Sequence, residues 1–434
     1  MCDNSIWETK LKRDEFPTLK EDIKTDVLII GGGITGVLLA YFLHNRGVDY
    51  VLVEKERIFS GVTENTTAKI TVQHGLIYQK ILKQFGVDNA SAYYKANNKA
   101  LNLYKSLCRD IDCDFEIKDN FVYSTNDISK IHKELEAVDK IGIDARFFSK
   151  LPLPLKTEGA VCFENQAQFN PLKFLNLISK NLNIYEHTKV LEMVGNKAKT
   201  EFGEIKADRV AVCTHFPFIN KHGLYFLKMY QHRSYVLALE NAQNAEGMYV
   251  DENNKGFSFR NYGKYLLLGG GGHRTGKQGG GYDELRRFAK GNYKNAKEIS
   301  RFATQDCETL DSVAYIGKYS NSSNNLFTAT GFNKWGMTTS MVAAELLSDM
   351  LTDTPNEFAK IFDPSRSILR PQLIVNAFET TVNLLTPTIK RCPHLGCALK
   401  WNSQEHSYDC ACHGSRFSQE GKILNGPATD DLKK

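Results

Sequence analysis

The stretch from residue 26 to residue 54 constrains the fold of this chain more than any other. Residues 26–30 form an apolar run that is typical of a buried parallel strand, and the run leads directly into Gly-Gly-Gly-Ile-Thr-Gly at 31–36. Apolar residues then recur at helical spacing as far as Gly47, and a second apolar strand ends at Glu54. A strand, a Gly-x-Gly-x-x-Gly turn, a helix and a strand in about 30 residues predict a dinucleotide-binding unit.

Each glycine of this turn has a physical role. Gly31 permits the tight turn, Gly33 lets the backbone approach a pyrophosphate, and Gly36 lets the helix pack on the sheet. The free amides at the helix N-terminus attract the anion, and Glu54 is expected to bind the ribose hydroxyls. The residues predicted to form this site are Gly31, Gly33, Ile34, Thr35, Gly36 and Glu54. A glycine turn that binds no ligand is the alternative.

Two short loops near the C-terminus each carry a cysteine followed by a histidine. The pairs are Cys392 with His394 and Cys410 with His413. Two thiolates and two imidazoles can hold tetrahedral zinc, or a [2Fe-2S] cluster in which two histidines replace two cysteines on one iron. The cluster is favoured because one cysteine and one histidine per loop supply a sulfur ligand to one iron and a nitrogen ligand to the other. A structural zinc site is the alternative.

The motifs Cys-x-His-x-Gly-Cys and Cys-x-Cys-His-Gly-Ser resemble those of the Rieske proteins, in the variant with a disulfide between the loops. The resemblance implies the iron ligands Cys392, His394, Cys410 and His413. It also implies a disulfide between Cys397 and Cys412, and a hydrogen bond from Ser415 to a bridging sulfide. Phe417 stands where the respiratory proteins have a tyrosine, so we expect a lower reduction potential than theirs.

Two late strands, predicted at 207–214 and 325–331, complete a second pattern. The latter strand leads into a glycine turn and a helix predicted at 341–351. With the first turn and the segment 310–317, these features resemble the D-amino-acid-oxidase-like family of FAD-dependent amine and amino-acid oxidoreductases, over about residues 25 to 352. A flavin domain followed by a Rieske motif is similar to a bacterial subgroup of fused oxidoreductases.

The family resemblance implies further contacts to FAD, which we expect to be bound without a covalent link. Trp7 and the loop at 66–69 are also similar to that subgroup, and backbone amides at 336–338 are expected to stabilise negative charge on the reduced flavin. The further residues implied to contact FAD are Lys55, Thr67, Lys69, Val190, Thr214, Gly331, Phe332, Gly336, Met337 and Thr338.

The chemistry implied by the resemblance is dehydrogenation of the C–N bond of an amine or amino acid. Electrons are then expected to pass one at a time between the flavin and the cluster to an external redox partner. A flavin reductase, electron-transfer protein or redox sensor with no amine substrate is the alternative. Two lysines of related oxidases are replaced here by Leu267 and Thr338, which favours a dehydrogenase over an oxygen-using oxidase.

The predicted substrate site contains His74, His273, Trp335 and Arg274. Arg233 is a further candidate for binding a substrate carboxylate. A core histidine with satisfied partners is the alternative for His74, and a solvated or paired side chain is the alternative for each arginine.

The predicted fold is α/β, a Rossmann-type FAD-binding domain with an inserted strand-rich substrate domain, followed by a small β and loop module of Rieske type. The predicted divisions are a leader at 1–25, the oxidoreductase domain at 26–352, a connector at 353–390 with a helix at 373–384, and a truncated cluster module at 391–434. Within the large domain, the FAD-binding parts are about 26–80, 185–220 and 310–352, and the substrate-side parts are about 81–184 and 221–309.

The totals exclude several classes of protein. A net charge of +5 over 434 residues, with lysines interspersed among acids, gives no basic stripe for nucleic acid. The uncharged run at 27–43 is too short for a membrane span and is interrupted by glycines. The polar leader differs from a signal peptide, and six further cysteines show no paired spacing. We therefore expect a cytoplasmic protein.

Overall fold

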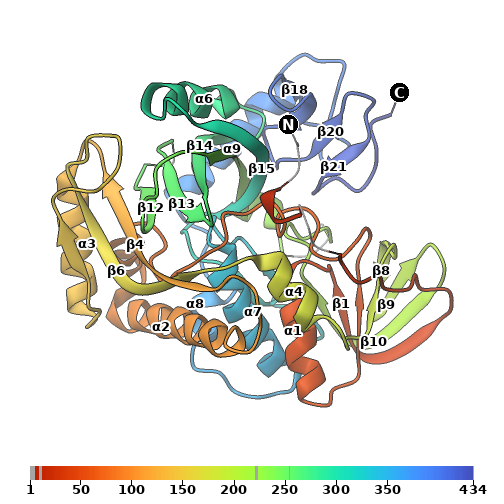
Figure 1. Ribbon diagram of the computed structural model, residues 1–434. Helices are drawn as coiled ribbons and strands as arrows, with labels where there is room; N and C mark the ends of the chain where they lie inside the picture. Colours follow the sequence, from red (N-terminus) through yellow and green to blue (C-terminus); the bar gives the residue numbers. More distant parts are fainter. Residues whose placement is uncertain (1–4, 9–11, 220–222, 254, 434) are drawn as a thin grey trace.

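The computed structural model describes residues 5–8, 12–219, 223–253 and 255–433. It contains a mixed α/β body built on two large sheets, and the C-terminal strands β18 to β21 lie beside that body (Figure 1). The order of strands in the first sheet is β16-β17-β10-β1-β2-β7, with β8 and β9 attached to β10. Its strands are β1 Ile23–Ile30, β2 Tyr50–Val53, β7 Ile184–Tyr185, β8 Val190–Val194, β9 Lys197–Thr200, β10 Glu204–Val212, β16 Tyr315–Lys318 and β17 Leu326–Thr330.

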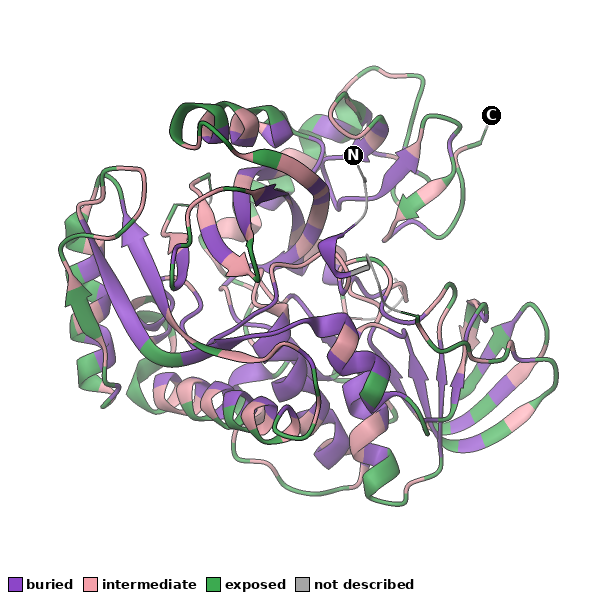
Figure 2. Cartoon of the chain, viewed as in Figure 1, coloured by how far each residue is buried: buried purple, intermediate pink, exposed green. Residues whose placement is uncertain are grey.

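Strand β1 is the centre of the first sheet and pairs in parallel with both β2 and β10. Val27 and Ile29 enter the core that contains α1 and α7, whereas Leu28 and Ile30 enter a second core on the other face. Burial on both faces explains why the strand is continuously apolar rather than alternating. Figure 2 shows the resulting buried strands and helices at the middle of the molecule.

Helices α1 and α7 pack on the first sheet. Helices α1 and α7 pack closely on each other, and α2 packs on α7. The helices are η1 Ile6–Glu8 (a short 3-10 helix), α1 Ile34–Asn45, α2 Tyr78–Leu107, α3 Ile128–Lys140, α4 Pro171–Ile178, α5 Tyr225–Lys228, α6 Gly281–Asn292, α7 Gly336–Leu351, α8 Ala359–Phe362 and α9 Pro371–Leu385. Helix α7 begins five residues before the predicted start, because the glycine turn at 336 already has helical backbone.

The second sheet has the order β15-β11-β14-β13-β12-β4-β6-β3, with β5 attached to β6. Its strands are β3 Lys69–Ile70, β4 Glu116–Ser124, β5 Arg146–Phe148, β6 Gly159–Gln168, β11 Met229–Glu240, β12 Met248–Asp251, β13 Ser258–Tyr262, β14 Tyr265–Arg274 and β15 Lys297–Thr309. The long strands β11 and β15 pair over their whole length and run towards the C-terminal module.

The C-terminal module is a four-stranded antiparallel sheet in the order β18-β19-β20-β21, with its own small core. The strands are β18 Leu399–Asn402, β19 Ser407–Cys410, β20 Arg416–Ser418 and β21 Ile423–Asn425. Among the residues that the structure describes, we find no helix with the length and apolar character to cross a membrane. Of the predicted leader, residues 1–4 and 9–11 lie outside the described part.

Candidate functional site

A cavity of about 960 Å³ extends from the glycine turn after β1 to the segment before α7. Residues from both large sheets and from 423–429 of the C-terminal module form its walls. Of the residues predicted from the sequence, those that line it are Gly31, Gly33, Ile34, Thr35, Glu54, Lys55, Thr67, Lys69, His74, Val190, Thr214, Gly331, Phe332, Trp335, Gly336 and Met337. One cavity therefore brings together residues that are separated by more than half of the chain.

The glycine turn is shaped by close backbone contacts. Gly31 has a φ angle of +111°, and a Cβ atom there would lie 2.7 Å from the carbonyl oxygen of Cys213. A Cβ atom on Gly36 would lie 2.0 Å from the carbonyl oxygen of Gly31. Gly36 does not line the cavity, so its place is in the packing of α1 against the turn. Gly33 caps α1 without a side chain, and the N–H of Ile34 donates to the hydroxyl of Thr63 at 3.1 Å.

Glu54 supports the turn as well as facing the cavity. Its carboxylate accepts hydrogen bonds from the backbone N–H groups of Gly32, at 2.7 Å, and Glu56, at 3.0 Å. Burial raises the pKa of Glu54, and these two hydrogen bonds oppose the shift. The acid at the end of β2 therefore fixes the turn and presents an oxygen-rich edge for hydroxyl groups.

The N-terminus of α7 faces the cavity through its backbone. Trp335 precedes the helix, and no side chain caps its first N–H groups. The backbone amide of Thr338 is among those predicted to contact FAD. The hydroxyl of Thr338 accepts from the N–H of Thr71 at 3.0 Å and donates to the carbonyl oxygen of Thr71 at 2.8 Å. Its side chain does not line the cavity and ties α7 to the loop before α2.

His74 lines the cavity with both ring nitrogens engaged. Tyr93 donates its hydroxyl to Nδ1 at 2.6 Å, and Nε2 lies 2.8 Å from the carbonyl oxygen of Thr71, which assigns the proton to Nε2. Burial lowers the pKa of His74 to about 3. The ring stacks on Trp335 with centroids 5.2 Å apart. His74 therefore forms a neutral, flat wall with Trp335. Both of its ring nitrogens have partners, as in the alternative of a core histidine.

Lys69 lies in the same wall. Burial, with a smaller effect of Arg260, lowers the pKa of Lys69 to about 7. Its Nζ atom donates to the hydroxyl of Thr67 at 3.3 Å, and the Arg260 guanidinium holds the loop by donating to the carbonyl oxygen of Ala68 at 3.0 Å. A lysine whose pKa lies near neutral pH can bind an anion or exchange a proton within this cavity.

Sequence reasoning missed a group of charged residues on β15. Asp306 and Glu308 line the cavity, and burial raises the pKa of Asp306 to about 6. Burial also raises the pKa of Glu308, but Lys334 and His232 outweigh it and hold that pKa below its usual value. Two acids that flank the buried Cys307 in a strand were the available signal, because charge inside a buried strand is costly.

His273 and Arg274, which were predicted to belong to the substrate site, do not line the cavity. The ring of His273 bonds to the hydroxyl of Tyr235 at 3.0 Å. Arg274 donates to the carbonyl oxygen of Ala411 at 3.2 Å and to the side chain of Asn376 at 3.0 Å. The end of β14 therefore contacts the C-terminal module.

Arg233, the further candidate for a carboxylate anchor, is also engaged by the C-terminal module. Its guanidinium pairs with Glu405, which lies between β18 and β19. The paired alternative for this arginine is thus what the structure shows.

The two C-terminal loops bring their cysteines and histidines together. Cys392 and Cys410 are buried and outside the disulfide, and a hydrogen bond between them lowers the pKa of Cys392 and raises that of Cys410. The rings of His394 and His413 lie 5.0 Å apart, and Nδ1 of His413 is buried with no hydrogen-bond partner. A metal ion bound to that nitrogen would satisfy it.

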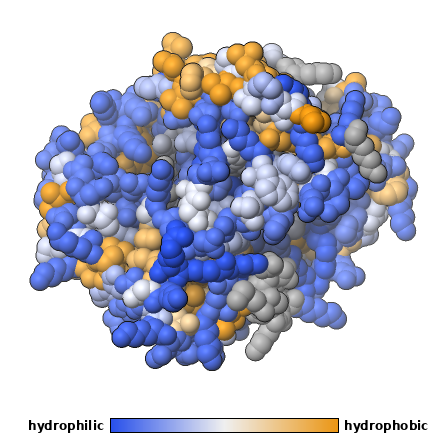
Figure 3. All heavy atoms as spheres, turned by 90° about the horizontal axis from the view of Figure 1, so that it is seen from above, coloured by the Kyte–Doolittle hydropathy of each residue, from blue (hydrophilic) through white to orange (hydrophobic). Residues whose placement is uncertain are grey.

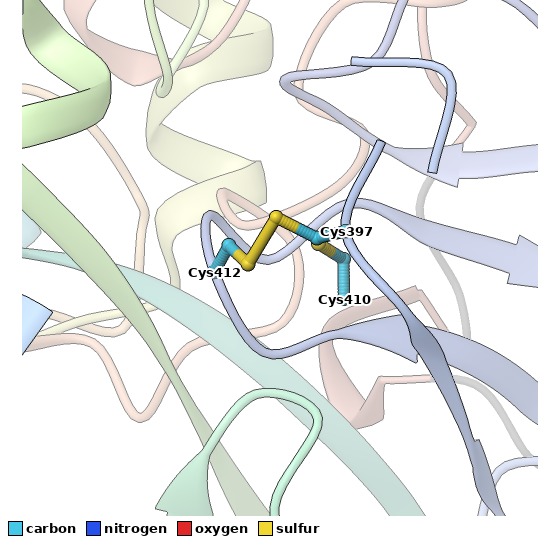
Figure 4. Close-up of side chains that lie close together, drawn as sticks. All are labelled: Cys397, Cys410 and Cys412. Atoms are coloured by element: carbon cyan, nitrogen blue, oxygen red, sulfur yellow. A yellow bond between two sulfur atoms is a disulfide. The ribbon is translucent and has the colours of Figure 1, made fainter. Parts of the chain in front are cut away.

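The other two cysteines of the loops, Cys397 and Cys412, form a disulfide (Figure 4). The sulfur atoms of Cys397, Cys410 and Cys412 lie within 4.8 Å of one another. Because two of the three are bonded to each other, they are not a ligand set. The thiols left for a metal are Cys410 and Cys392.

Two buried glutamines connect the cavity to the second loop. Gln231 on β11 and Gln305 on β15 both line the cavity. Gln231 donates to the carbonyl oxygen of His413 at 2.7 Å, and Gln305 donates to that of Gly414 at 2.8 Å. The loop that carries Cys410 and His413 is therefore bonded directly to the cavity wall.

Comparison with known proteins matches two separate parts of the chain to two family models. The family model described as FAD dependent oxidoreductase matches residues 26–350. The chain belongs to this family. A second model, described as Rieske [2Fe-2S] domain, matches residues 375–434. The family domain therefore binds FAD and the C-terminal domain binds a [2Fe-2S] cluster. The glycine turn, the helix N-termini at the cavity and the two Cys/His pairs fit these groups.

Similar proteins share one or both parts. The Bacillus subtilis protein YhfW, whose name describes it as a Rieske 2Fe-2S iron-sulfur protein, is 36% identical over 99% of this chain and 97% of its own length. The cytochrome b6-f complex iron-sulfur subunit 2 of a Synechocystis species is 51% identical over 56 residues, which are 13% of this chain and 30% of that protein.

Solved structures share the fold of the FAD domain. Glycine oxidase from Geobacillus kaustophilus aligns with a TM-score of 0.67 at 17% identity, over 80% of this chain and 99% of that one. L-proline dehydrogenase from P. horikoshii aligns with the same TM-score at 19% identity, over 80% and 98%. Identities this low establish the fold alone.

Proposed function

We propose that the chain dehydrogenates the C–N bond of an amine or amino acid and passes the electrons singly to an external redox partner. FAD, when bound, accepts a hydride, and a [2Fe-2S] cluster carries one electron at a time. The observation that supports the proposal is a wall that the cavity shares with the cluster loop. Gln231 and Gln305 line the cavity and hold the loop of Cys410 and His413, so the two redox sites are bridged by protein bonds.

The side chains of the cavity suit a cationic amine. Asp306 supplies a carboxylate that is ionised above about pH 6, where it attracts an ammonium group and can take its proton. Trp335 and His74 provide a flat wall without charge, which orients the substrate. Lys69, which lines the same cavity, can bind the carboxylate of an amino acid.

Two positions favour a dehydrogenase. Leu267 is fully buried within β14, and the Thr338 hydroxyl is bonded to Thr71. Neither position presents to the cavity the lysine expected of the related oxidases. We therefore expect the reduced protein to react slowly with oxygen and quickly with a one-electron acceptor.

The test is anaerobic mixing of the purified protein with single amines and amino acids, with the flavin and iron–sulfur absorbance followed separately. The expected result is bleaching of the flavin band followed by bleaching of the cluster band. The variant Gln305→Leu replaces one residue of the cavity wall and removes one of the two glutamine bonds to the loop, the bond to the carbonyl oxygen of Gly414. It should slow only the second phase.

Other outcomes would contradict the proposal. Bleaching by NAD(P)H, but by no amine or amino acid, would favour the flavin reductase instead. Rapid oxygen consumption with an amine would make the protein an oxidase. Equal rates of cluster reduction in the wild type and in Gln305→Leu would show that electrons do not reach the cluster through the shared wall.

A further inference from the structure

Helix α9, residues Pro371–Leu385, has its polar and apolar faces reversed relative to an ordinary surface helix. Asn376 and Asn383, seven residues apart, are its two buried residues. The apolar residues face outwards at helical spacing, with exposed fractions of 74% for Ile374 and 66% for Phe378. The exposed apolar residues of the helix are Ile374, Val375, Phe378, Val382, Leu384 and Leu385.

Polar contacts fix the helix in this orientation. The side-chain oxygen of Asn376 accepts from Arg274 at 3.0 Å, and the acid of the helix, Glu379, pairs with Lys277 at 2.6 Å. The carbonyl oxygen of Asn383 accepts from the N–H of Ala398 at 2.9 Å. Turning the helix to bury its apolar face would break all of these bonds, so the outward apolar face is built into the fold.

Further exposed apolar residues flank the helix in the sequence. Leu369 before α9 is 80% exposed, and Ile389 after it is fully exposed. Leu395, which follows the cluster residue His394, is also exposed. We call Leu369, the exposed residues of α9, Ile389 and Leu395 the apolar face. Helix α9 lies at the top and rear of Figure 1, and in Figure 3, seen from above, hydrophobic atoms gather along the upper edge.

The charges beside the apolar face are positive. Lys390, Arg391 and Lys400 are exposed, and in the described part of the chain none of them pairs with an acid. Glu379 is already neutralised by Lys277. Lys390 lies over the ring of Tyr408 at 3.8 Å, which places its charge on the surface of the module. A lipid surface with negative headgroups is complementary to this arrangement.

We propose that the apolar face lies on an anionic lipid surface, with α9 parallel to the surface and the basic residues among the headgroups. An interfacial helix needs a broad apolar face and adjacent lysines or arginines, and a helix of 15 residues, about 22 Å long, is too short to span a bilayer. The inference does not depend on the substrate. It brings the edge of the cluster site to the membrane.

Two other occupants fit less well. A second copy of the chain in a twofold dimer would bring the same basic residues against each other, which costs free energy. A protein partner is usually bound through aromatic and arginine side chains with hydrogen-bonding groups. The outward residues of α9 are aliphatic except for Phe378 and Thr381.

The test is flotation of the full-length protein, with FAD and cluster bound, on neutral phosphatidylcholine vesicles and on vesicles with about a third phosphatidylglycerol. We expect binding to the anionic vesicles that is lost in Ile374→Ser/Phe378→Ser. Neutralising the charges in Lys390→Gln/Lys400→Gln should lower binding to anionic vesicles about fivefold per residue. The matched control Val194→Ser/Phe202→Ser changes two exposed apolar residues at β8 and after β9 and should bind like the wild type.

Other results would overturn the proposal. These are failure of the wild type to bind anionic vesicles, equal binding by Ile374→Ser/Phe378→Ser, or a dimer in sedimentation velocity that this variant dissociates while no vesicle binding occurs. The last result would assign the face to a second copy. Unchanged flavin and cluster absorbance and an unchanged melting temperature would show that each variant is folded, so a loss of binding is specific to the surface.

Discussion

Arg233 on β11 is joined to Glu405 of the C-terminal module by an ion pair that is almost completely buried. Nε of Arg233 lies 3.0 Å from Oε2 of Glu405, and Arg416 approaches the other carboxylate oxygen at 2.9 Å. Burial raises the pKa of Glu405, but Arg233 and Arg416 outweigh it and hold the pKa below its usual value. The module is thus attached to the FAD domain through a buried carboxylate that pairs with one arginine from each part.

Removal of Arg233 should be strongly destabilising. The variant Arg233→Met leaves Glu405 buried with one cation fewer, and breaking a buried pair costs about 3 kcal/mol. Urea unfolding measures the loss, and the double variant Arg233→Met/Glu405→Met should lose less than the sum of the single losses. Arg146→Met, which breaks the exposed pair with Glu164, is the control and should cost less than about 1 kcal/mol. Strictly additive losses would contradict the buried pair.

The partly buried carboxylate of Asp306 should make stability depend on pH. Burial raises its pKa to about 6 in the folded protein, so folding favours the protonated form. The cost of ionising it is absent below pH 4, grows as the pH rises towards 6, and is complete above pH 7. Asp306→Asn should therefore stabilise the FAD-free protein at pH 7, by at most about 3 kcal/mol, and have no effect at pH 4.

Melting curves of wild type and Asp306→Asn between pH 4 and 8 check this dependence. A difference in melting temperature that is constant over the range would contradict the raised pKa. If Asp306 binds the substrate ammonium, the same variant should also raise the KM for amines, and this second readout separates the proposed role from the effect on stability.

The fold was predictable where local sequence and global structure agree. The strand, turn and helix at 26–45 were evident because β1 is buried on both faces and the glycines are required by backbone contacts as close as the one between Gly36 and Gly31. The two Cys/His pairs were also readable, because each depends on short spacing within one loop, and the disulfide between the loops was implied by the resemblance to the Rieske proteins.

The junction between the domains was not predictable, because it depends on long-range pairing. Arg233 and Arg274 carry the positive charge expected of residues that bind a substrate carboxylate. Only the register of β11 and β14 places them against the module. Gln231 and Gln305 are 74 residues apart, and the pairing of β11 with β15 brings them together. Nothing in the local sequence distinguishes these glutamines from those of a solvated strand.

The disulfide between Cys397 and Cys412 should stabilise the cluster module. It closes a loop of 15 residues, which corresponds to about 3 kcal/mol. Cys397→Ser/Cys412→Ser should release iron to a chelator faster than the wild type, measured by the cluster absorbance, while the flavin absorbance stays unchanged. Wild type treated with a thiol reductant should approach the rate of the variant. Equal rates for the untreated wild type and the variant would show that the disulfide does not hold the loops.

Hydrogen bonds to the sulfur atoms should set the potential of the cluster. The Ser415 side chain bonds to Cys392, and its oxygen accepts from the N–H of Ala428 at 3.0 Å, which fixes the rotamer. A donor to a cluster sulfur stabilises the reduced, more negative state. The bond is worth about 1 kcal/mol, or about 40 mV for one electron, so Ser415→Ala should lower the midpoint potential by that amount.

Phe417 provides the converse experiment. It is fully buried on β20 and lacks the hydroxyl that respiratory Rieske proteins carry at this position, so the wild-type potential should lie below theirs. Phe417→Tyr should raise the potential by a similar amount, measured by a redox titration with electron paramagnetic resonance of the reduced cluster. A wild-type potential as high as the respiratory values, or no response to either substitution, would show that burial and charge rather than these two bonds control the cluster.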